Sequence, residues 1–158
     1  MIAEILGGGF NSRLFKEIRS NQGLAYAVGS TPGTGWRFPG TFVAFSGTKC
    51  ETTEQALDVM LEQIGLMTTE PVTEEELQEA VDGIMNSDVF NYDTKREILD
   101  RLVMFERYGY PEDFLQQYQA AVKAMTKEDV LAAAQAVVEG TILGLYRYQE
   151  LKNQDPER

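Results

Sequence analysis

The 158-residue sequence contains no histidine and a single cysteine, Cys50. Histidine is the commonest metal ligand and the usual general base at neutral pH, so its absence removes both from this chain. One cysteine cannot form a disulfide within the chain, and Cys50 stands among polar residues with no histidine or second cysteine beside it. We therefore expect no metal site in this chain.

Long hydrophobic runs and positive charge are also scarce. No apolar run is long enough to cross a bilayer, so we expect no membrane span. The net charge of −11 argues against nucleic acid, which proteins bind through clustered Lys and Arg. The charge is uneven, since residues 1–49 carry a net charge of +3 and residues 50–158 one of −14. Length and composition are otherwise those of one globular domain.

The spacing of apolar residues predicts strands, then several helices, then one more strand. Residues 2–6 have helical spacing, and a second helix is predicted from a cap at Asn11 or Ser12 to a stop near Gly23. Strands are predicted at 24–31 and 40–47, as antiparallel neighbours, and at 141–148. The starts of the later helices are predicted from capping boxes, in which a threonine is followed three residues later by an acid or amide: Thr52 with Gln55, Thr73 with Glu76, Thr94 with Glu97, and Thr126 with Asp129.

This order of elements predicts an α+β fold in which several helices pack on a largely antiparallel sheet. Residues 1–148 are expected to form a single domain, and residues 149–158 a polar tail or linker. The helical pattern at 2–6 has no cap before it, and three strands are few for the number of helices. We therefore expect an N-terminally truncated domain that lacks its first strands.

Three glycines follow the first helical segment. Their pattern fits neither of the common phosphate-binding loops. It predicts a helix break that lets backbone approach backbone, or that leaves room for a molecule bound at close range. Arg13, Lys16 and Arg19 then recur every third residue and are predicted to form a basic helix surface.

The run from Leu6 to Tyr26, LGGGFNSRLFKEIRSNQGLAY, resembles the C-terminal half-domain of the insulinase- or pitrilysin-like zinc metallopeptidases, the inverzincins. Their active halves carry the motif H-x-x-E-H. The resemblance continues through residues 40–48, 72–77, 108–111 and 125–130, so it covers nearly the whole chain.

This resemblance implies a non-zinc half that faces a homologous, H-x-x-E-H-bearing half around a closed chamber, in the same polypeptide or as separate subunits. It implies zinc in the partner half and none here. The matching positions imply that Arg19 and Tyr26 are catalytic residues that reach a peptide substrate near the scissile bond. Substrate-binding residues are predicted at the glycine segment: Gly7, Gly8, Gly9 and Phe10.

The expected function is therefore to contact substrate in a zinc-dependent peptidase that cleaves peptides or unfolded segments, with a preference for carboxylate-bearing ones. The chain alone is expected to be inactive. Two alternatives stay open: a non-proteolytic structural or assembly subunit of the same fold, and a stand-alone peptide-binding module. By residue type alone, Arg19 could instead bind helix C-terminal carbonyls, with Tyr26 an ordinary strand residue. Localisation is left open between the cytoplasm and the periplasm of a prokaryote.

Overall fold

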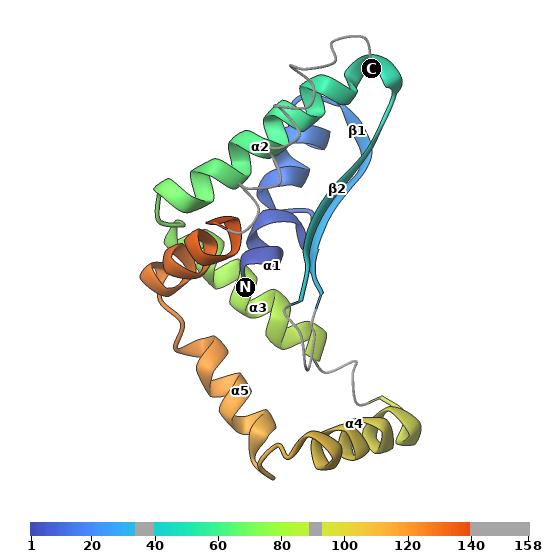
Figure 1. Cartoon of the computed structure of the whole chain (residues 1–158), viewed down its shortest axis with the longest axis vertical. Helices are drawn as coiled ribbons and strands as arrows, with labels where there is room; N and C mark the ends of the chain where they lie inside the picture. Colours follow the sequence, from blue (N-terminus) through green and yellow to red (C-terminus); the bar gives the residue numbers. More distant parts are fainter. Residues whose placement is uncertain (34–39, 89–92, 140–158) are drawn as a thin grey trace.

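The computed structural model describes residues 1–33, 40–88 and 93–139, which form an α+β fold (Figure 1). In chain order the elements are α1 (Ile2–Gly7), the π-helix η1 (Phe15–Asn21), β1 (Ala25–Pro32), β2 (Phe42–Thr48), the 3-10 helix η2 (Cys50–Thr52), α2 (Thr53–Thr69), α3 (Glu74–Asp88), α4 (Lys95–Tyr108) and α5 (Phe114–Lys123). Residues 127–139 form a further helix. Within these described stretches, no helix is both long and apolar enough to cross a membrane. The predicted α+β class is confirmed, whereas the predicted strand at 141–148 and tail at 149–158 lie outside the described residues.

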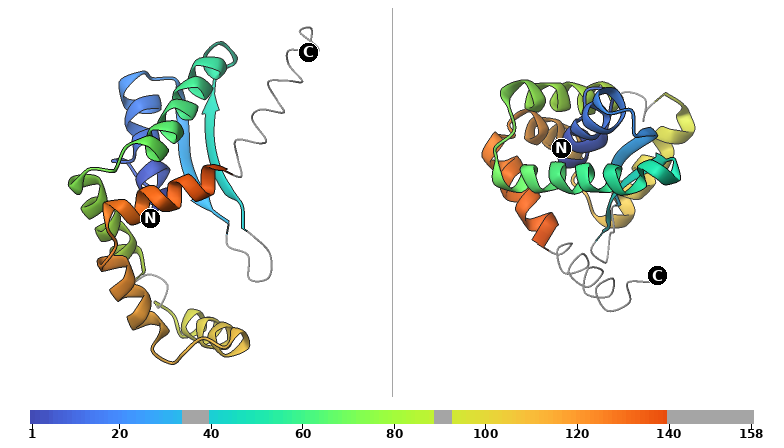
Figure 2. Two further views of the ribbon diagram at one scale, coloured as in Figure 1. Left: turned by 60° about the vertical axis from the view of Figure 1, so that its left-hand side comes forward. Right: turned by 90° about the horizontal axis from the view of Figure 1, so that it is seen from above.

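The two strands form an antiparallel pair, as predicted. Val28 lies opposite Ser46, and Ser30 lies opposite Ala44. Exposure alternates along β2, so that one face of the pair is more buried than the other. Elements α1, η1 and α2 lie on one side of the strands (Figures 1 and 2), which accounts for that alternation.

The segment between α1 and β1 is held by local hydrogen bonds that differ in part from the prediction. Gly23 ends the helical stretch with a φ of 61°, and the N–H of Leu24 donates to the carbonyl of Ile18 (2.8 Å), as in a glycine-terminated helix. The two predicted caps bind elsewhere. The Ser12 hydroxyl donates to the Gly9 carbonyl (2.6 Å), and the Asn11 amide donates to the Glu79 carboxylate (3.0 Å).

Three of the four predicted capping boxes are confirmed. At Thr73, Thr94 and Thr126 the hydroxyl accepts a hydrogen bond from the backbone N–H three residues on, and the acidic side chain there accepts from the threonine N–H. The prediction at Thr52 is wrong. Thr52 is instead the last residue of η2, and its hydroxyl donates to the carbonyls of Leu24 (3.0 Å) and Lys49 (3.2 Å).

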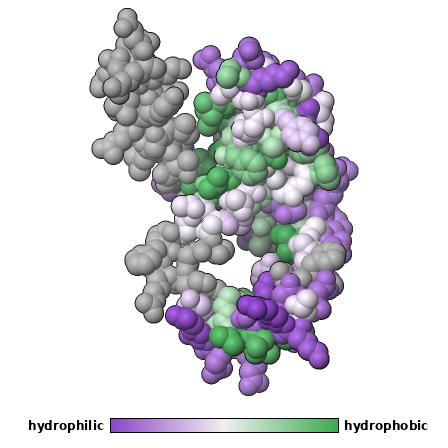
Figure 3. All heavy atoms as spheres, turned by 90° about the vertical axis from the view of Figure 1, so that its right-hand side faces the viewer, coloured by the Kyte–Doolittle hydropathy of each residue, from purple (hydrophilic) through white to green (hydrophobic). Residues whose placement is uncertain are grey.

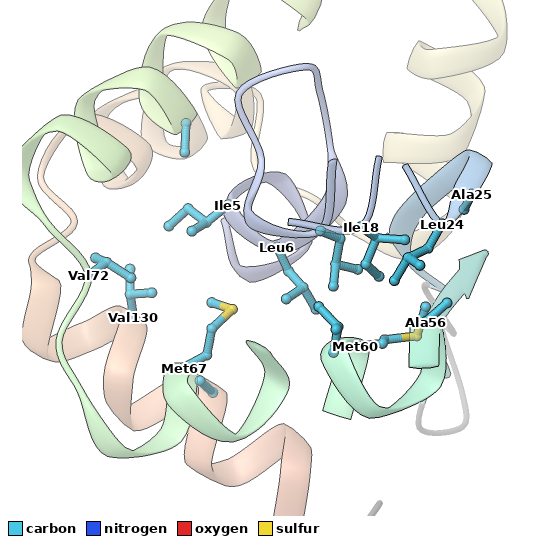
Figure 4. Packing of buried hydrophobic residues seen from close by; sticks show 14 of the residues in the cluster. Ile5, Leu6, Ile18, Leu24, Ala25, Ala56, Met60, Met67, Val72 and Val130 are labelled. Carbon is cyan, nitrogen blue, oxygen red and sulfur yellow. The ribbon is translucent and has the colours of Figure 1, made fainter. Parts of the chain in front are cut away.

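The core lies between the strand pair and the helices that cover it (Figure 4). Leu6 from α1, Ile18 from η1, and Met60 from α2 point into it together (Figure 4). Val130, from the helix at 127–139, extends the cluster toward Val72 and Met67 (Figure 4). The core thus ties η1 to both flanking helices and fixes where that segment ends.

Helix α4 carries an apolar stripe that is not part of the core. Ile98, Leu99, Leu102 and Val103 are all exposed, Leu99 and Leu102 at 58% each. The reason is that α4 and α5 extend away from the main body (Figure 1), joined by a cluster of aromatic rings such as Tyr110 and Phe114, whose centroids are 4.2 Å apart. Figure 3 shows apolar surface at this end of the molecule and a second apolar area over the strands.

Candidate functional site

Arg19 and Tyr26, which the sequence analysis paired, lie together in the structure. Arg19 stands in the last turn of η1, and Tyr26 is the second residue of β1. The guanidinium carbon of Arg19 lies 5.1 Å from the centre of the Tyr26 ring. Tyr26 is 83% exposed, so its phenol is open to a bound molecule. The geometry therefore differs from an arginine that binds helix carbonyls beside an unrelated strand residue.

A β-bulge sets the direction of Tyr26. Ala25 lies opposite Thr48 and Ala27 opposite Gly47, so Tyr26 is an extra residue with no partner in the register. Bulges change the side-chain direction at a strand end and are frequent beside active sites. A regular strand alternates between buried and exposed residues, so the bulge explains why two successive residues, Tyr26 and Ala27, are both exposed.

Two phenylalanines complete the surroundings of Arg19. The guanidinium carbon lies 4.8 Å from the ring centre of Phe15, one turn earlier on the same helical segment. The Phe10 ring in turn packs edge-on against Phe15, with centroids 4.9 Å apart and an interplanar angle of 87°. The sequence analysis assigned no role to Phe15. Its contact with Arg19 could have been predicted from their spacing, because residues four apart in a helix are neighbours on its surface.

A hollow of about 470 Å³ opens beside Tyr26. Its walls come from the start of β1, the end of β2 and the segment that leads into α2. Gly23, Tyr26, Thr48, Lys49 and Thr52 contribute to the lining. A side chain or backbone segment of a ligand could therefore lie next to the phenol, with a lysine in the wall.

The predicted substrate-binding glycines have different surroundings. A methyl group on Gly7 would lie 2.3 Å from the Ser30 nitrogen, so Gly7 lets the end of α1 meet the backbone of β1. Gly9 has nothing within 4 Å of such a methyl group, and Phe10 is 77% exposed. The backbone approach expected of the glycine segment is thus observed at Gly7, while substrate binding at Gly7, Gly8, Gly9 and Phe10 stays a prediction.

The predicted basic helix surface is smaller than expected. Arg13 forms a bidentate ion pair with Glu76 of α3, from Nε to Oε1 at 2.6 Å and from Nη2 to Oε2 at 2.9 Å. Their side chains are only 15% and 20% exposed. Arg13 therefore does not contribute to an open basic surface, and Glu76, besides completing the capping box at Thr73, anchors the segment that carries Arg19.

The ion pair makes stability depend on pH. The hydrogen bonds from Arg13, with a further one from the Thr73 backbone, hold the pKa of Glu76 below its ordinary value of 4.5. A carboxyl whose pKa is lowered by folding stabilises the fold above its unfolded pKa, and this contribution is lost as pH falls through the folded pKa. The contribution is therefore complete at neutral pH and disappears in acid.

We expect Glu76→Gln to lower the free energy of unfolding at pH 7 by about 1–3 kcal/mol, because it removes charge-assisted hydrogen bonds while glutamine can still serve the cap. The difference from wild type should shrink as pH falls from about 5 to about 3. Urea unfolding at several pH values measures both effects. Glu75→Gln, in the same turn but exposed, is the matched control and should change stability little at any pH. A gap between wild type and Glu76→Gln that stays constant with pH would contradict this assignment.

The described residues of this chain do not form a zinc site. The sequence has no histidine, and in the described part no three His, Cys, Asp or Glu residues are grouped so that they could hold a metal ion. What the site does offer is a phenol, a guanidinium and an ammonium group beside an open hollow. Such groups bind carbonyl and carboxylate oxygens.

Known proteins resemble this chain in sequence and in fold. A family model described as the peptidase M16 inactive domain matches residues 1–84. The chain is 27% identical over 133 residues to an uncharacterized zinc protease of Streptomyces coelicolor, a match that covers 84% of this chain and 29% of that protein. It is 32% identical over 120 residues to an uncharacterized zinc protease of Rickettsia felis, covering 73% of this chain and 29% of that protein.

Among solved structures, the crystal structure of a peptidase M16 inactive domain from Pseudomonas fluorescens is similar, with a TM-score of 0.72 and 27% identity. That match covers 85% of this chain and 32% of the other. The chain thus spans about 29% of the length of the curated relatives from Streptomyces and Rickettsia.

Proposed function

Because this chain belongs to the insulinase-like M16 peptidase family and matches its inactive domain, we propose that it is the substrate-contacting half of a zinc-dependent peptidase. The family resemblance of the run from Leu6 to Tyr26 is thereby confirmed. In the proposed enzyme, zinc and the H-x-x-E-H motif belong to a partner half, in the same polypeptide or in another subunit. Substrates are peptides or unfolded segments that enter a chamber between the halves.

The observation that carries the proposal is the Arg19 and Tyr26 pair, with the guanidinium over the ring of an exposed tyrosine. Zinc in the partner half would supply a nucleophilic water and polarise the attacked carbonyl. As that carbonyl oxygen gains negative charge, the Tyr26 hydroxyl can donate a hydrogen bond to it. Arg19 can donate to a main-chain carbonyl of the same substrate through several N–H groups at once.

The test is cleavage of a quenched fluorescent peptide by the complex that this chain forms in its source lysate. We expect no cleavage by the chain alone, cleavage by the complex, and loss of cleavage on chelation of zinc. Arg19→Ala should strongly lower the rate of peptide cleavage by the complex without preventing its assembly. A stable complex that cleaves no peptide would instead favour the non-proteolytic assembly subunit, and tight peptide binding without any partner would favour the binding module.

Lys49 in the wall of the hollow supports a preference for carboxylate-bearing peptides. We expect Lys49→Glu to lower kcat/KM about three- to tenfold for peptides with Asp or Glu near the scissile bond, since it replaces an attraction with a repulsion. Neutral peptides should be cleaved at nearly the wild-type rate. Lys95→Glu, on α4, is the matched charge reversal away from the hollow and should affect neither class. An equal loss for acidic and neutral peptides would exclude this role for Lys49.

A further inference from the structure

A free arginine side chain samples many rotamers, so the Arg19 guanidinium needs contacts that hold it in one position. Its guanidinium carbon contacts two aromatic rings, at 4.8 Å from the centre of Phe15 and 5.1 Å from that of Tyr26. Phe10 packs edge-on against Phe15. Three aromatic rings and one cation thus form a continuous row of contacts, which we call the Arg19 stack.

The position of Phe15 in this stack differs from that of the other rings. Phe15 and Arg19 are both half-buried, whereas Phe10 and Tyr26 are strongly exposed. Phe15 also belongs to the same helical segment as Arg19, and that segment is anchored by Ile18 in the core. The Phe15 ring is therefore the fixed surface of the stack, against which the arginine lies.

An aromatic ring holds a guanidinium in a particular way. The attraction acts through the face of the guanidinium plane, while its N–H donors point outward along the edge. A carboxylate partner would hold the same group by occupying those donors, as Glu76 does with Arg13. In the described part of the chain, the recorded ion pairs and hydrogen bonds leave the Arg19 donors unused.

We propose that Phe15 is a positioning residue, whose ring holds the Arg19 guanidinium over Tyr26 while leaving its N–H donors free for a substrate carbonyl. This inference rests on the proposed function for its consequence in catalysis. The contact itself can be tested in the chain alone. The two parts of the inference therefore have separate measurements.

The first measurement is the NMR resonance of the Arg19 Nε–H group in the 158-residue chain. A proton close to the face of a ring is shifted by the ring current, so we expect a displaced resonance in the wild type. Phe15→Leu, which stays apolar but loses the ring, should return the resonance toward the ordinary arginine position. Phe15→Tyr, which keeps the ring, should retain the displacement. An unchanged resonance in Phe15→Leu would overturn the proposal.

The second measurement is the kinetics of the assembled peptidase. Losing a cation–ring contact should lower kcat about 3- to 30-fold in Phe15→Leu, with KM less affected and with recovery in Phe15→Tyr. The same substitution made in an Arg19→Ala background should have little further effect, because the positioned group is already gone. If Phe15→Leu slows the enzyme equally with and without Arg19, Phe15 has a general packing role and the proposal fails.

A folding defect would be recognised by thermal unfolding of each variant, and Phe15→Met provides a second ring-free side chain with more freedom to fill the space. The two measurements separate the two ideas. If the Arg19 resonance responds as expected but the wild-type complex cleaves no peptide, the proposed function fails while the hold of Phe15 on Arg19 stands. If peptides are cleaved but the resonance does not respond, the positioning role fails alone.

Discussion

Tyr26→Phe is expected to lower kcat of the proposed peptidase complex about 100- to 1,000-fold, with KM changed far less. The substitution removes one hydroxyl and keeps the ring, so the contact with the Arg19 guanidinium survives. Removal of one donor to a developing oxyanion typically costs about this much in rate. An interaction made only in the transition state affects kcat rather than KM. Steady-state kinetics on a quenched fluorescent peptide measures both constants.

Tyr118→Phe is the matched control, since it removes a partly exposed hydroxyl from α5, away from the Arg19 stack. It should leave both constants near wild type. Tyr26→Phe should also unfold at nearly the wild-type temperature, because the exposed Tyr26 side chain contributes little to the core. A rise in KM with an unchanged kcat would mean that Tyr26 only binds substrate.

Gly7→Ala is expected to destabilise the fold by about 3 kcal/mol or more. The added methyl group would lie 2.3 Å from the Ser30 nitrogen and 2.5 Å from the Gly29 carbonyl carbon, which are backbone atoms with little freedom to move. Either α1 or β1 must shift, and such overpacking costs energy. The Ser30 hydroxyl also donates to the Ala3 carbonyl (2.8 Å), so the same shift strains a second link between α1 and β1. Urea unfolding of wild type and Gly7→Ala at neutral pH measures the difference in their free energy of unfolding.

Gly9→Ala is the control for this effect. Its added methyl group would meet no atom within 4 Å, and Gly9 is not among the described glycines with positive φ. We expect a change within about 0.5 kcal/mol, or a small gain from the reduced entropy of the unfolded chain. Equal stability of the Gly7 and Gly9 variants would show that α1 does not depend on close approach to β1.

Features that depend on neighbouring residues could be predicted from the sequence. The boxes at Thr73, Thr94 and Thr126 were predictable because both partners lie within one turn. The box at Thr52 failed because its hydroxyl binds the Leu24 carbonyl, 28 residues earlier in the chain. Apolar periodicity placed α4 but could not show that Leu99 would be exposed, since exposure depends on where the helix lies in the fold.

Some features of the candidate site could likewise be predicted from the sequence, whereas others depend on residues far apart in the chain. Family resemblance identified Arg19 and Tyr26, and the structure brings them together. The bulge that exposes Tyr26 depends on the register between two strands, and the pairing of Arg13 with Glu76 spans 63 residues, so neither could be predicted from local pattern. The contact between Phe15 and Arg19 is different, because it joins residues only four apart in the sequence. Their spacing was visible in the sequence, but it indicates a functional contact only if Arg19 itself has a function.

Photo-crosslinking from position 26 tests whether a peptide substrate touches Tyr26 in the proposed peptidase complex. A photoreactive phenylalanine derivative is incorporated at position 26 and, as control, at position 118, and the complex is irradiated with a labelled peptide while chelation of zinc prevents turnover. We expect a peptide adduct at position 26 that unlabelled substrate competes away, and none at position 118. Absence of an adduct at position 26 from a complex that binds the peptide would contradict the claim that this half contacts substrate through Tyr26.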